Sequence, residues 1–212
     1  MRAALAAAGP PVPSPVELAG FDTSFLPEAM RAEIGGRPPR PSAVLAPLYD
    51  HGGEAWVVLT RRSADLRSHS GELSFPGGGL DPTDADLRAT ALREAHEETG
   101  LDPATVEIIG ELDHLSTITS GSYIVPFVGV IPGRPELVPN EAEVDAILHV
   151  PLAELLQPDI FREELWPLGD QARSIVFFDL VGDTLWGATA AMLRQLLGLL
   201  TGTVARGELG HD

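Results

Sequence analysis

The chain has 212 residues, about one and a half times the usual size of a domain, which favours one large domain over two. It carries 31 acidic and 14 basic residues, and a net charge of −17 disfavours nucleic acid and anionic membranes as partners. The sequence contains neither cysteine nor lysine, which excludes thiol nucleophiles, disulfides, cysteine-ligated zinc, Schiff-base lysines and P-loops.

The N-terminal part of the sequence predicts an arm outside the folded domain. Met1–Pro15 is small and apolar, but four prolines interrupt it, so neither an export signal nor a membrane span is predicted and the cytoplasm is the default location. We expect a loose arm over residues 1–41, with room for a short helix or two in Val16–Glu33. The folded domain is predicted over residues 42–201, followed by a tail over 202–212.

The remaining predicted elements are six strands and two helices. Asp84–Thr99 has helical periodicity, an aspartate placed to cap its N-terminus, and Gly100 to end it. Ala188–Leu200 predicts a second helix, apolar on more than one face and therefore well buried. The mixture indicates an α/β (α+β) fold. Six apolar runs rich in β-branched or aromatic residues predict strands over Ala43–Tyr49, Ala55–Thr60, Val106–Leu112, Ile124–Ile131, Val144–Val150 and Ser174–Leu180.

The first of these helices carries an acidic stripe. At roughly 100° per residue, Glu94, Glu97 and Glu98 fall within an arc of about 100°. Two of them continue the stripe that Leu87 and Ala91 begin, and that stripe should face the core. A solvated acidic face is the alternative, but clustered carboxylates that face inward repel each other and require a positive partner. A hard divalent cation with oxygen ligands is the usual one.

Two neighbours of the glutamates do not change this interpretation. Arg93 can pair with Glu97 one turn away, but one guanidinium does not neutralise three acids. His96–Glu97 begins like the zinc-protease motif H-E-x-x-H, yet position 100 is glycine, so that reading fails. We interpret His96 as a structural or surface residue.

A basic cluster lies upstream in this otherwise acidic chain. Arg61, Arg62, Arg67 and His69 stand shortly before the glycine-rich turn at residues 77–79. Solvated loop charges are one explanation. Next to a glycine-rich turn and an acidic helix, however, these side chains indicate an anion site, because a diphosphate needs cations from both a metal and the protein.

The segment Arg93–Leu101 resembles the second half of the Nudix box, R-E-U-x-E-E-x-G-U, where U is a bulky aliphatic residue. Ala95 is a small occupant of the first U position. Phe75–Gly78 resembles the start of the box, but the spacing from Gly78 to Arg93 is one residue too long and Asp84 stands where glutamate is expected.

This departure recurs in the coenzyme A pyrophosphatase branch of the Nudix family. Residues 58–78 are similar to that branch's second motif, L-L-T-x-R followed by G-x-x-x-F-P-G-G, and the likeness covers residues 42–200. The resemblance implies a Nudix-type α/β/α sandwich with a mixed β-sheet. It also implies divalent-metal-dependent hydrolysis of the diphosphate of coenzyme A or acyl-CoA, giving 3′,5′-ADP and 4′-phosphopantetheine or its acyl form.

The resemblance also implies roles for individual residues. Glu94, Glu97 and Glu98 would hold Mg²⁺ or Mn²⁺, Arg93 would orient these carboxylates, and Glu97 and Glu98 would take part in catalysis. Of the two glutamates before the strand at 144, Glu141 and Glu143, we favour Glu143 as general base because it matches a glutamate of the coenzyme A branch. The substrate would contact Arg61, Arg62, Arg67, His69, Gly77, Gly78, Thr117, Ser120 and Tyr123.

Several alternatives stay open at this point. A Nudix hydrolase for ADP-ribose, NADH, another dinucleotide or an oxidised nucleotide is the first. A catalytically silent nucleotide-binding Nudix domain and an acidic cation-binding scaffold are the others, although the clustered carboxylates argue against the silent domain and the arginines against the scaffold. A small-molecule nucleotide is the expected partner, and a homodimer is an open oligomeric state.

Overall fold

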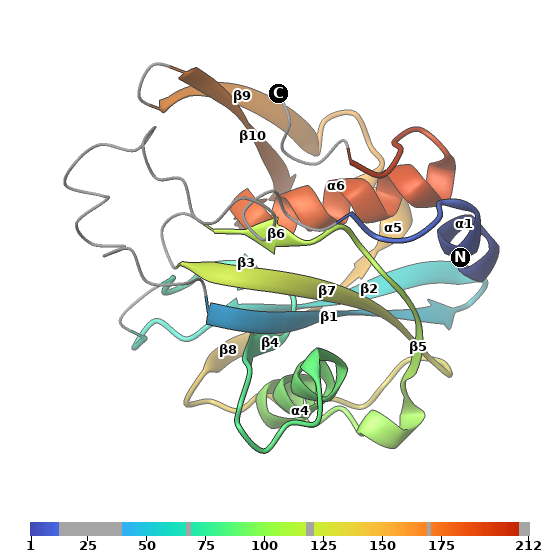
Figure 1. Cartoon of the computed structure of the whole chain (residues 1–212), viewed down its shortest axis with the longest axis vertical. Coiled ribbons are helices and arrows are strands. Elements are labelled where there is room, and N and C mark those ends of the chain that lie inside the picture. The colour runs from blue at the N-terminus through green and yellow to red at the C-terminus, as the bar shows by residue number, and fades with distance from the viewer. Residues whose placement is uncertain (13–39, 67–68, 118–120, 169–170, 208–212) are drawn as a thin grey trace.

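A mixed sheet of eight strands forms the centre of the computed structural model, which describes residues 1–12, 40–66, 69–117, 121–168 and 171–207. One helix covers each face of this sheet, and a second, three-stranded sheet packs outside one of the helices (Figure 1). The predicted α/β/α sandwich with a mixed sheet is therefore confirmed, with one additional layer.

The central strand of the main sheet is β1, Arg40–His51. It pairs in parallel with β7, Ser122–Ile131, along almost its whole length. On its other edge, β4 (Gly77–Gly79) pairs with its first half and β2 (Glu54–Arg62) with its second half, both antiparallel. The remaining strands of this sheet are β3 (Leu73–Ser74), β5 (Glu107–Glu111), β6 (Leu115–Ser116) and β8 (Val144–Pro151).

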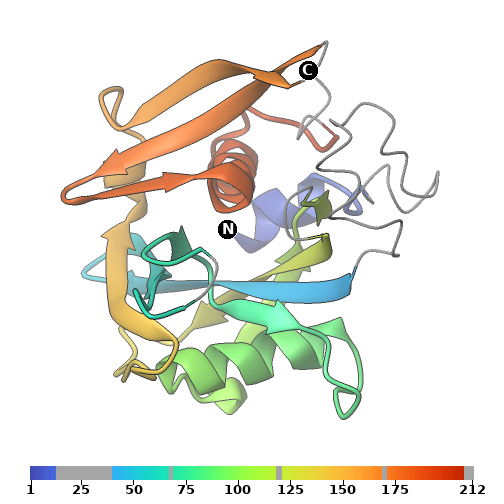
Figure 2. The same ribbon diagram turned by 90° about the vertical axis from the view of Figure 1, so that its left-hand side faces the viewer.

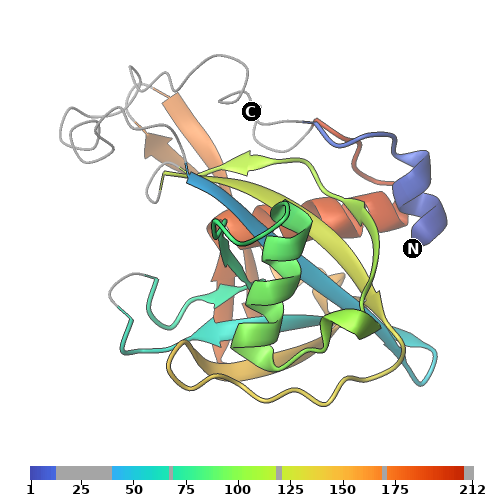
Figure 3. The same cartoon turned by 60° about the horizontal axis from the view of Figure 1, so that its bottom comes forward.

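Side chains of β1 alternate between two apolar cores, as the two-residue period of a strand requires. Leu45 and Tyr49 belong to the core under helix α4, Leu87–Thr99, which lies across one face of the sheet (Figure 3). Ala46 and Leu48 belong to the other core, under helix α6, Gly187–Thr201.

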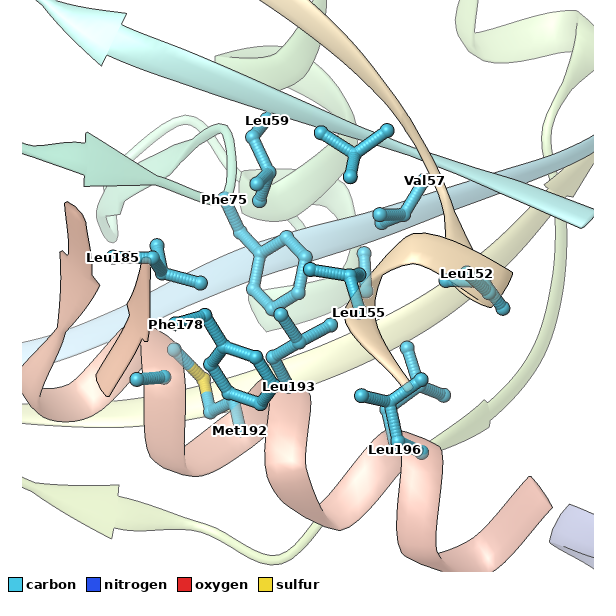
Figure 4. Packing of buried hydrophobic residues seen from close by; sticks show 14 of the residues in the cluster. Val57, Leu59, Phe75, Leu152, Leu155, Phe178, Leu185, Met192, Leu193 and Leu196 are labelled. Atoms are coloured by element: carbon cyan, nitrogen blue, oxygen red, sulfur yellow. The ribbon is translucent and has the colours of Figure 1, made fainter. Parts of the chain in front are cut away.

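The core under α6 is closed by aromatic and leucine side chains. Figure 4 shows Phe75 between the main sheet and α6, with Leu155, Phe178 and Leu193 around it. Leu155 belongs to the short helix α5, Leu152–Leu155, which follows β8. All four side chains are at most 2% exposed, so this core fixes α6 and the second sheet on the main sheet.

The second sheet is antiparallel and contains β9 (Phe161–Leu168), β10 (Gln171–Leu180) and β11 (Asp183–Trp186). Figure 2 shows α6 end-on between the two sheets. The sequence predicted part of β10 but not β9 or β11. β9 was not predicted because Arg162, Glu163, Glu164 and a proline leave no apolar run, and its strand conformation depends on pairing with β10.

Both predicted helices are present. α4 begins at Leu87, three residues after the expected start at Asp84. Its N-cap is Asp86, whose carboxylate accepts a hydrogen bond from the Ala89 N–H. It ends at Gly100, which has a φ of 69° and so takes the left-handed conformation that favours glycine. A 3₁₀ turn, η1 (Pro103–Thr105), leads from there into β5.

The first residues of the chain differ from the loose arm that we predicted. Arg2–Ala7 forms helix α1, which packs against α6 and β5 and buries Leu5 to 3% exposure. Packing of this leucine stabilises a helix too short to persist alone. The helices expected in Val16–Glu33 lie outside the described residues. In the ranges that are described, no helix has the length and apolar character needed to cross a membrane.

Segments near both ends of the described chain meet at one buried carboxylate, that of Asp113. It accepts hydrogen bonds from the backbone N–H groups of Val12 and Gly207 and pairs with Arg206 at 3.1 Å. Burial alone would raise the pKa of Asp113, but these two backbone hydrogen bonds and the hydrogen bond from Arg206 lower it below its ordinary value.

Candidate active site

Glu98 lies at the inner end of the acidic stripe on α4 and is only 2% exposed. The Gly77 N–H donates a hydrogen bond to its Oε2 at 3.2 Å, and the Arg62 Nη1 lies 3.9 Å from its Oε1. Burial raises the pKa of Glu98 to about 7, and the hydrogen bond and the Arg62 charge oppose that rise only in part. Gly77 and Arg62 therefore hold the Glu98 carboxylate in place but do not fully compensate its negative charge.

Glu94 lies one turn earlier, half-buried against the glycine strand β4. A Cβ built on Gly78 would stand 2.5 Å from the Glu94 Cδ, so the side chain fills the space that a glycine leaves. Burial is the main cause that raises the pKa of Glu94, and the charges of Glu97 and Glu143 add to it while Arg93 opposes it. The half-buried carboxylate of Glu94 is thus repelled by the charges of Glu97 and Glu143.

Arg93 connects the acidic helix to the loop before it. Its Nε and Nη2 donate to the two oxygens of Asp84, each at 2.9 Å, and its Nη2 also donates to the Gly79 carbonyl. Its Nη1 lies 2.9 Å from both Glu94 and Glu97. Hydrogen bonds from Arg93 hold the pKa of Asp84 well below its usual range. Arg93 therefore positions the glutamates, and Asp84 positions Arg93.

The role of Asp84 was missed in the sequence, where it appeared only as a departure from the glutamate of the Nudix box. The spacing of Asp84 and Arg93 could have indicated this role. Asp84 lies nine residues before Arg93, in the turn that leads into the helix, and from there it can form a forked pair with the arginine.

Two other acids flank this pair of glutamates. Glu97 is the outermost acid, with its side chain 52% exposed and paired with Arg93. Glu143 is exposed in the loop before β8, and its charge raises the pKa of both Glu94 and Glu98, which places it on the same side of the site. His96 is structural, as predicted: its Nδ1 contacts the Leu101 carbonyl at 3.0 Å.

A cavity of about 340 Å³ opens beside Glu98, between β4 and the start of α6. Arg62 and Gly77 line its inner end, and Trp186 lines it at the end of β11. His69 and Thr117, both predicted to contact substrate, also line it. His69 has a φ of 56°, a strained value for a residue other than glycine, beside this cavity. A neighbouring hollow of about 280 Å³ is lined by Gly77, Gly78 and Gly79.

Two of the other predicted substrate residues, Arg61 and Tyr123, lie away from this cavity. Arg61 points to the opposite side of β2 from Arg62 and forms a forked ion pair with Asp183 of β11. Tyr123 belongs to the core under α4, and its hydroxyl contacts the Nδ1 of His114. The two remaining predicted residues, Arg67 and Ser120, lie outside the described residues.

The donor chemistry of the site fits a divalent cation. Its ligands would be carboxylate oxygens, which Mg²⁺ and Mn²⁺ prefer, and the mutual repulsion of Glu94, Glu98 and Glu143 is the imbalance that a cation removes. Within the described ranges no three acidic or histidine side chains converge closely enough to hold a metal directly, because Arg93 draws Glu94 and Glu97 toward itself. Binding of a cation therefore requires these side chains to turn inward.

A carboxylate helix packed on a glycine strand, beside a cavity lined by a half-buried arginine, suits metal-assisted hydrolysis of a phosphate anhydride. Residues 39–171 match the family model described as NUDIX domain. The chain belongs to the Nudix family and is a hydrolase of nucleoside diphosphate derivatives, as the motif predicted. Nudix hydrolases generally use divalent metal ions.

Bacterial relatives carry the name Uncharacterized Nudix hydrolase NudL. The chain is 39% identical to the protein of Pectobacterium atrosepticum over 161 residues, which is 74% of this chain and 81% of that protein. It is 40% identical to the protein of Photorhabdus laumondii over 158 residues, 74% of this chain and 83% of that protein.

The fold is also similar to that of solved structures. A binary complex of the C. elegans Ap4A hydrolase superposes with a TM-score of 0.53 at 15% identity and covers 77% of this chain and 98% of that one. At this identity the likeness establishes the fold alone.

Proposed function

We propose that this Nudix hydrolase cleaves the diphosphate bond of coenzyme A or an acyl-CoA, giving 3′,5′-ADP and 4′-phosphopantetheine or its acyl form. The observation that carries the proposal is that two motifs meet at one carboxylate. Arg62, from the segment similar to the coenzyme A branch, and Gly77, from the glycine turn, both lie against Glu98 of the Nudix box.

The arrangement of charge supports a diphosphate as substrate. Glu98 and Glu94 would hold the cation, with Glu97 as a further ligand, and Arg62 would supply positive charge from the protein on the cavity side. A bound cation supplies charge neutralisation on the phosphate oxygens and lowers the pKa of the attacking water. Of the three glycines of β4, Gly79 leaves open space for a diphosphate, whereas Val44 occupies the space at Gly77 and Glu94 the space at Gly78.

The other residues of the site position groups and move a proton. Arg93 holds the glutamates from the outer side and would release Glu94 and Glu97 toward the cation. Glu143 is the group that we propose as general base, since it is exposed on the same side as Glu94 and Glu98 and needs no rearrangement of the core to reach a water.

Product analysis tests the proposal directly. The wild-type chain would be incubated with coenzyme A, NADH and ADP-ribose, each with Mg²⁺ and with a chelator, and the products identified by mass spectrometry. We expect 3′,5′-ADP and 4′-phosphopantetheine, with Mg²⁺ only. Products from NADH or ADP-ribose alone would refute the substrate, and turnover in the presence of chelator would refute the metal.

A matched pair of variants tests the role of Glu98. Glu98→Gln keeps the size of the side chain and removes a buried charge, so it should lower kcat by about 100-fold or more without lowering the thermal stability at neutral pH. Glu141→Gln removes an exposed carboxylate from the nearby loop and should leave kcat unchanged. Equal activity of the two variants contradicts the assignment.

A further inference from the structure

The outer face of the second sheet carries a cluster of aromatic rings that the reaction described above does not use. Phe177 lies at its centre and is 6% exposed, whereas Trp166 and Trp186 around it remain 45% and 40% exposed. The Phe177 and Trp186 rings stack with their planes 12° apart, and Trp166 lies 6.3 Å from Trp186 between ring centroids. Large exposed aromatic side chains that gather in this way mark binding surfaces.

The rings are held in fixed orientations from several sides. The Arg162 guanidinium lies 3.9 Å above the Phe177 ring centre, on a strand that pairs with β10. The Trp166 Nε1–H donates to Glu164 at 2.7 Å. Trp186 ends β11, which the Arg61–Asp183 ion pair fastens to the main sheet. A rigid platform of this kind loses little entropy when it binds a ligand.

Trp186 connects this platform to the candidate active site. It lines the same cavity of about 340 Å³ as Arg62 and Gly77, both of which lie against Glu98. A substrate whose diphosphate sits between the glutamates and Arg62 therefore extends one of its two ends toward the indole. The Thr189 side chain in the same cavity offers a hydroxyl group for the edge of that end.

We propose that Trp186, supported by Phe177 and Trp166, is the stacking platform for the adenine base of the substrate. The inference rests on the proposed function, which supplies a diphosphate with an adenine at one end and a pantetheine at the other. A flat π-system gains stacking energy on an indole face, whereas the pantetheine end has no aromatic ring to stack. Arg61 accordingly positions the platform through Asp183 and does not contact the diphosphate.

Binding measurements separate this platform from the hydrolytic site. ADP, inorganic pyrophosphate and 4′-phosphopantetheine would be titrated by calorimetry, in one Mg²⁺ buffer, into the wild type and the variants Trp186→Ala, Trp186→Phe and Leu165→Ala. Leu165 is exposed on the same sheet but outside the cavity, so its variant is the matched control. The tryptophan fluorescence would be recorded in parallel.

We expect Trp186→Ala to weaken ADP binding by about 5- to 150-fold and to leave the affinity for pyrophosphate unchanged. Trp186→Phe keeps a stacking ring and should retain most of the ADP affinity, while ADP should quench less of its tryptophan fluorescence than in the wild type. Leu165→Ala should bind all three probes like the wild type.

Several results would overturn the proposal. Unchanged ADP affinity in Trp186→Ala is one, and an equal loss for ADP and pyrophosphate is another. A loss confined to 4′-phosphopantetheine would assign the surface to the opposite end of the substrate. A shift from dimer to monomer in sedimentation, with ADP binding intact, would make it an interface between two copies. Because these measurements need no turnover, the platform can fail while wild-type hydrolysis of coenzyme A still supports the proposed function.

Discussion

Gly78→Ala adds a single methyl group at the point where β4 meets the carboxylate of Glu94. The new Cβ would stand 2.5 Å from Cδ and 2.6 Å from both oxygens, whereas ordinary contact begins at 3.4 Å. The carboxylate must therefore withdraw by about 0.9 Å, and a displacement of about 1 Å at a reacting centre costs roughly 100-fold in rate. We expect kcat/KM to fall by about that factor.

The neighbouring glycine provides the control. A Cβ on Gly79 has no atom within 4 Å, so Gly79→Ala should retain wild-type kinetics in the same strand. The assay is steady-state hydrolysis of coenzyme A with Mg²⁺, together with Mn²⁺ affinity by calorimetry and a thermal melt of each variant. Because Glu94 is a flexible side chain, Gly78→Ala should cost only about 1 kcal/mol of stability or less. Full activity in Gly78→Ala, or equal losses in both variants, would refute the reasoning.

Three further predictions concern the charged groups. Asp84→Ala frees Arg93 from its forked partner and should lower kcat/KM by about 10- to 100-fold. Mn²⁺ affinity is the second measurement, and unchanged kcat/KM and Mn²⁺ affinity would contradict the prediction. Arg62→Ala should raise KM for coenzyme A by about 10- to 100-fold, and Arg61→Ala should raise it less, because only Arg62 lies against Glu98. A larger rise in KM for Arg61→Ala in steady-state kinetics would contradict this assignment. Asp113→Ala should lower the free energy of unfolding by about 3–5 kcal/mol, measured in urea, because it leaves a buried guanidinium without its partner. Since the folded-state pKa of Asp113 is lowered, its stabilisation is present above the unfolded pKa of about 4 and is lost as pH falls through the folded value, so the wild type and Asp113→Ala should converge in acid.

The elements that sequence could predict are those with local signals. α4 has an N-cap, a helical stripe and a terminal glycine within one segment, and its acidic end was predicted from the stripe alone. α6 is apolar on several faces because both sheets cover it. In contrast, α1 forms by packing Leu5 against distant elements, and β9 depends on β10 for its hydrogen bonds.

The site was predicted in its acidic half and only partly in its basic half. Arg61 and Arg62 are neighbours in sequence, but successive side chains of a strand point to opposite faces, so only one of them reaches the cavity. The same alternation places Ser122 at the cavity and Tyr123 on the other face. Trp186 lies within the region similar to the coenzyme A branch, but its aromatic neighbours could not be predicted from the sequence. They come together only because β11 pairs with β10, which places Phe177 beside Trp186.

The meeting of two distant backbone segments at Asp113 has a practical consequence for handling the protein. Shortening the chain after Thr203 would remove both Arg206 and Gly207 and leave the aspartate charge sealed inside without a counterion. A protease cut between Thr203 and Arg206 would thus weaken the interior and not just the surface. Expression designs should therefore keep Arg206 and Gly207, which contact Asp113.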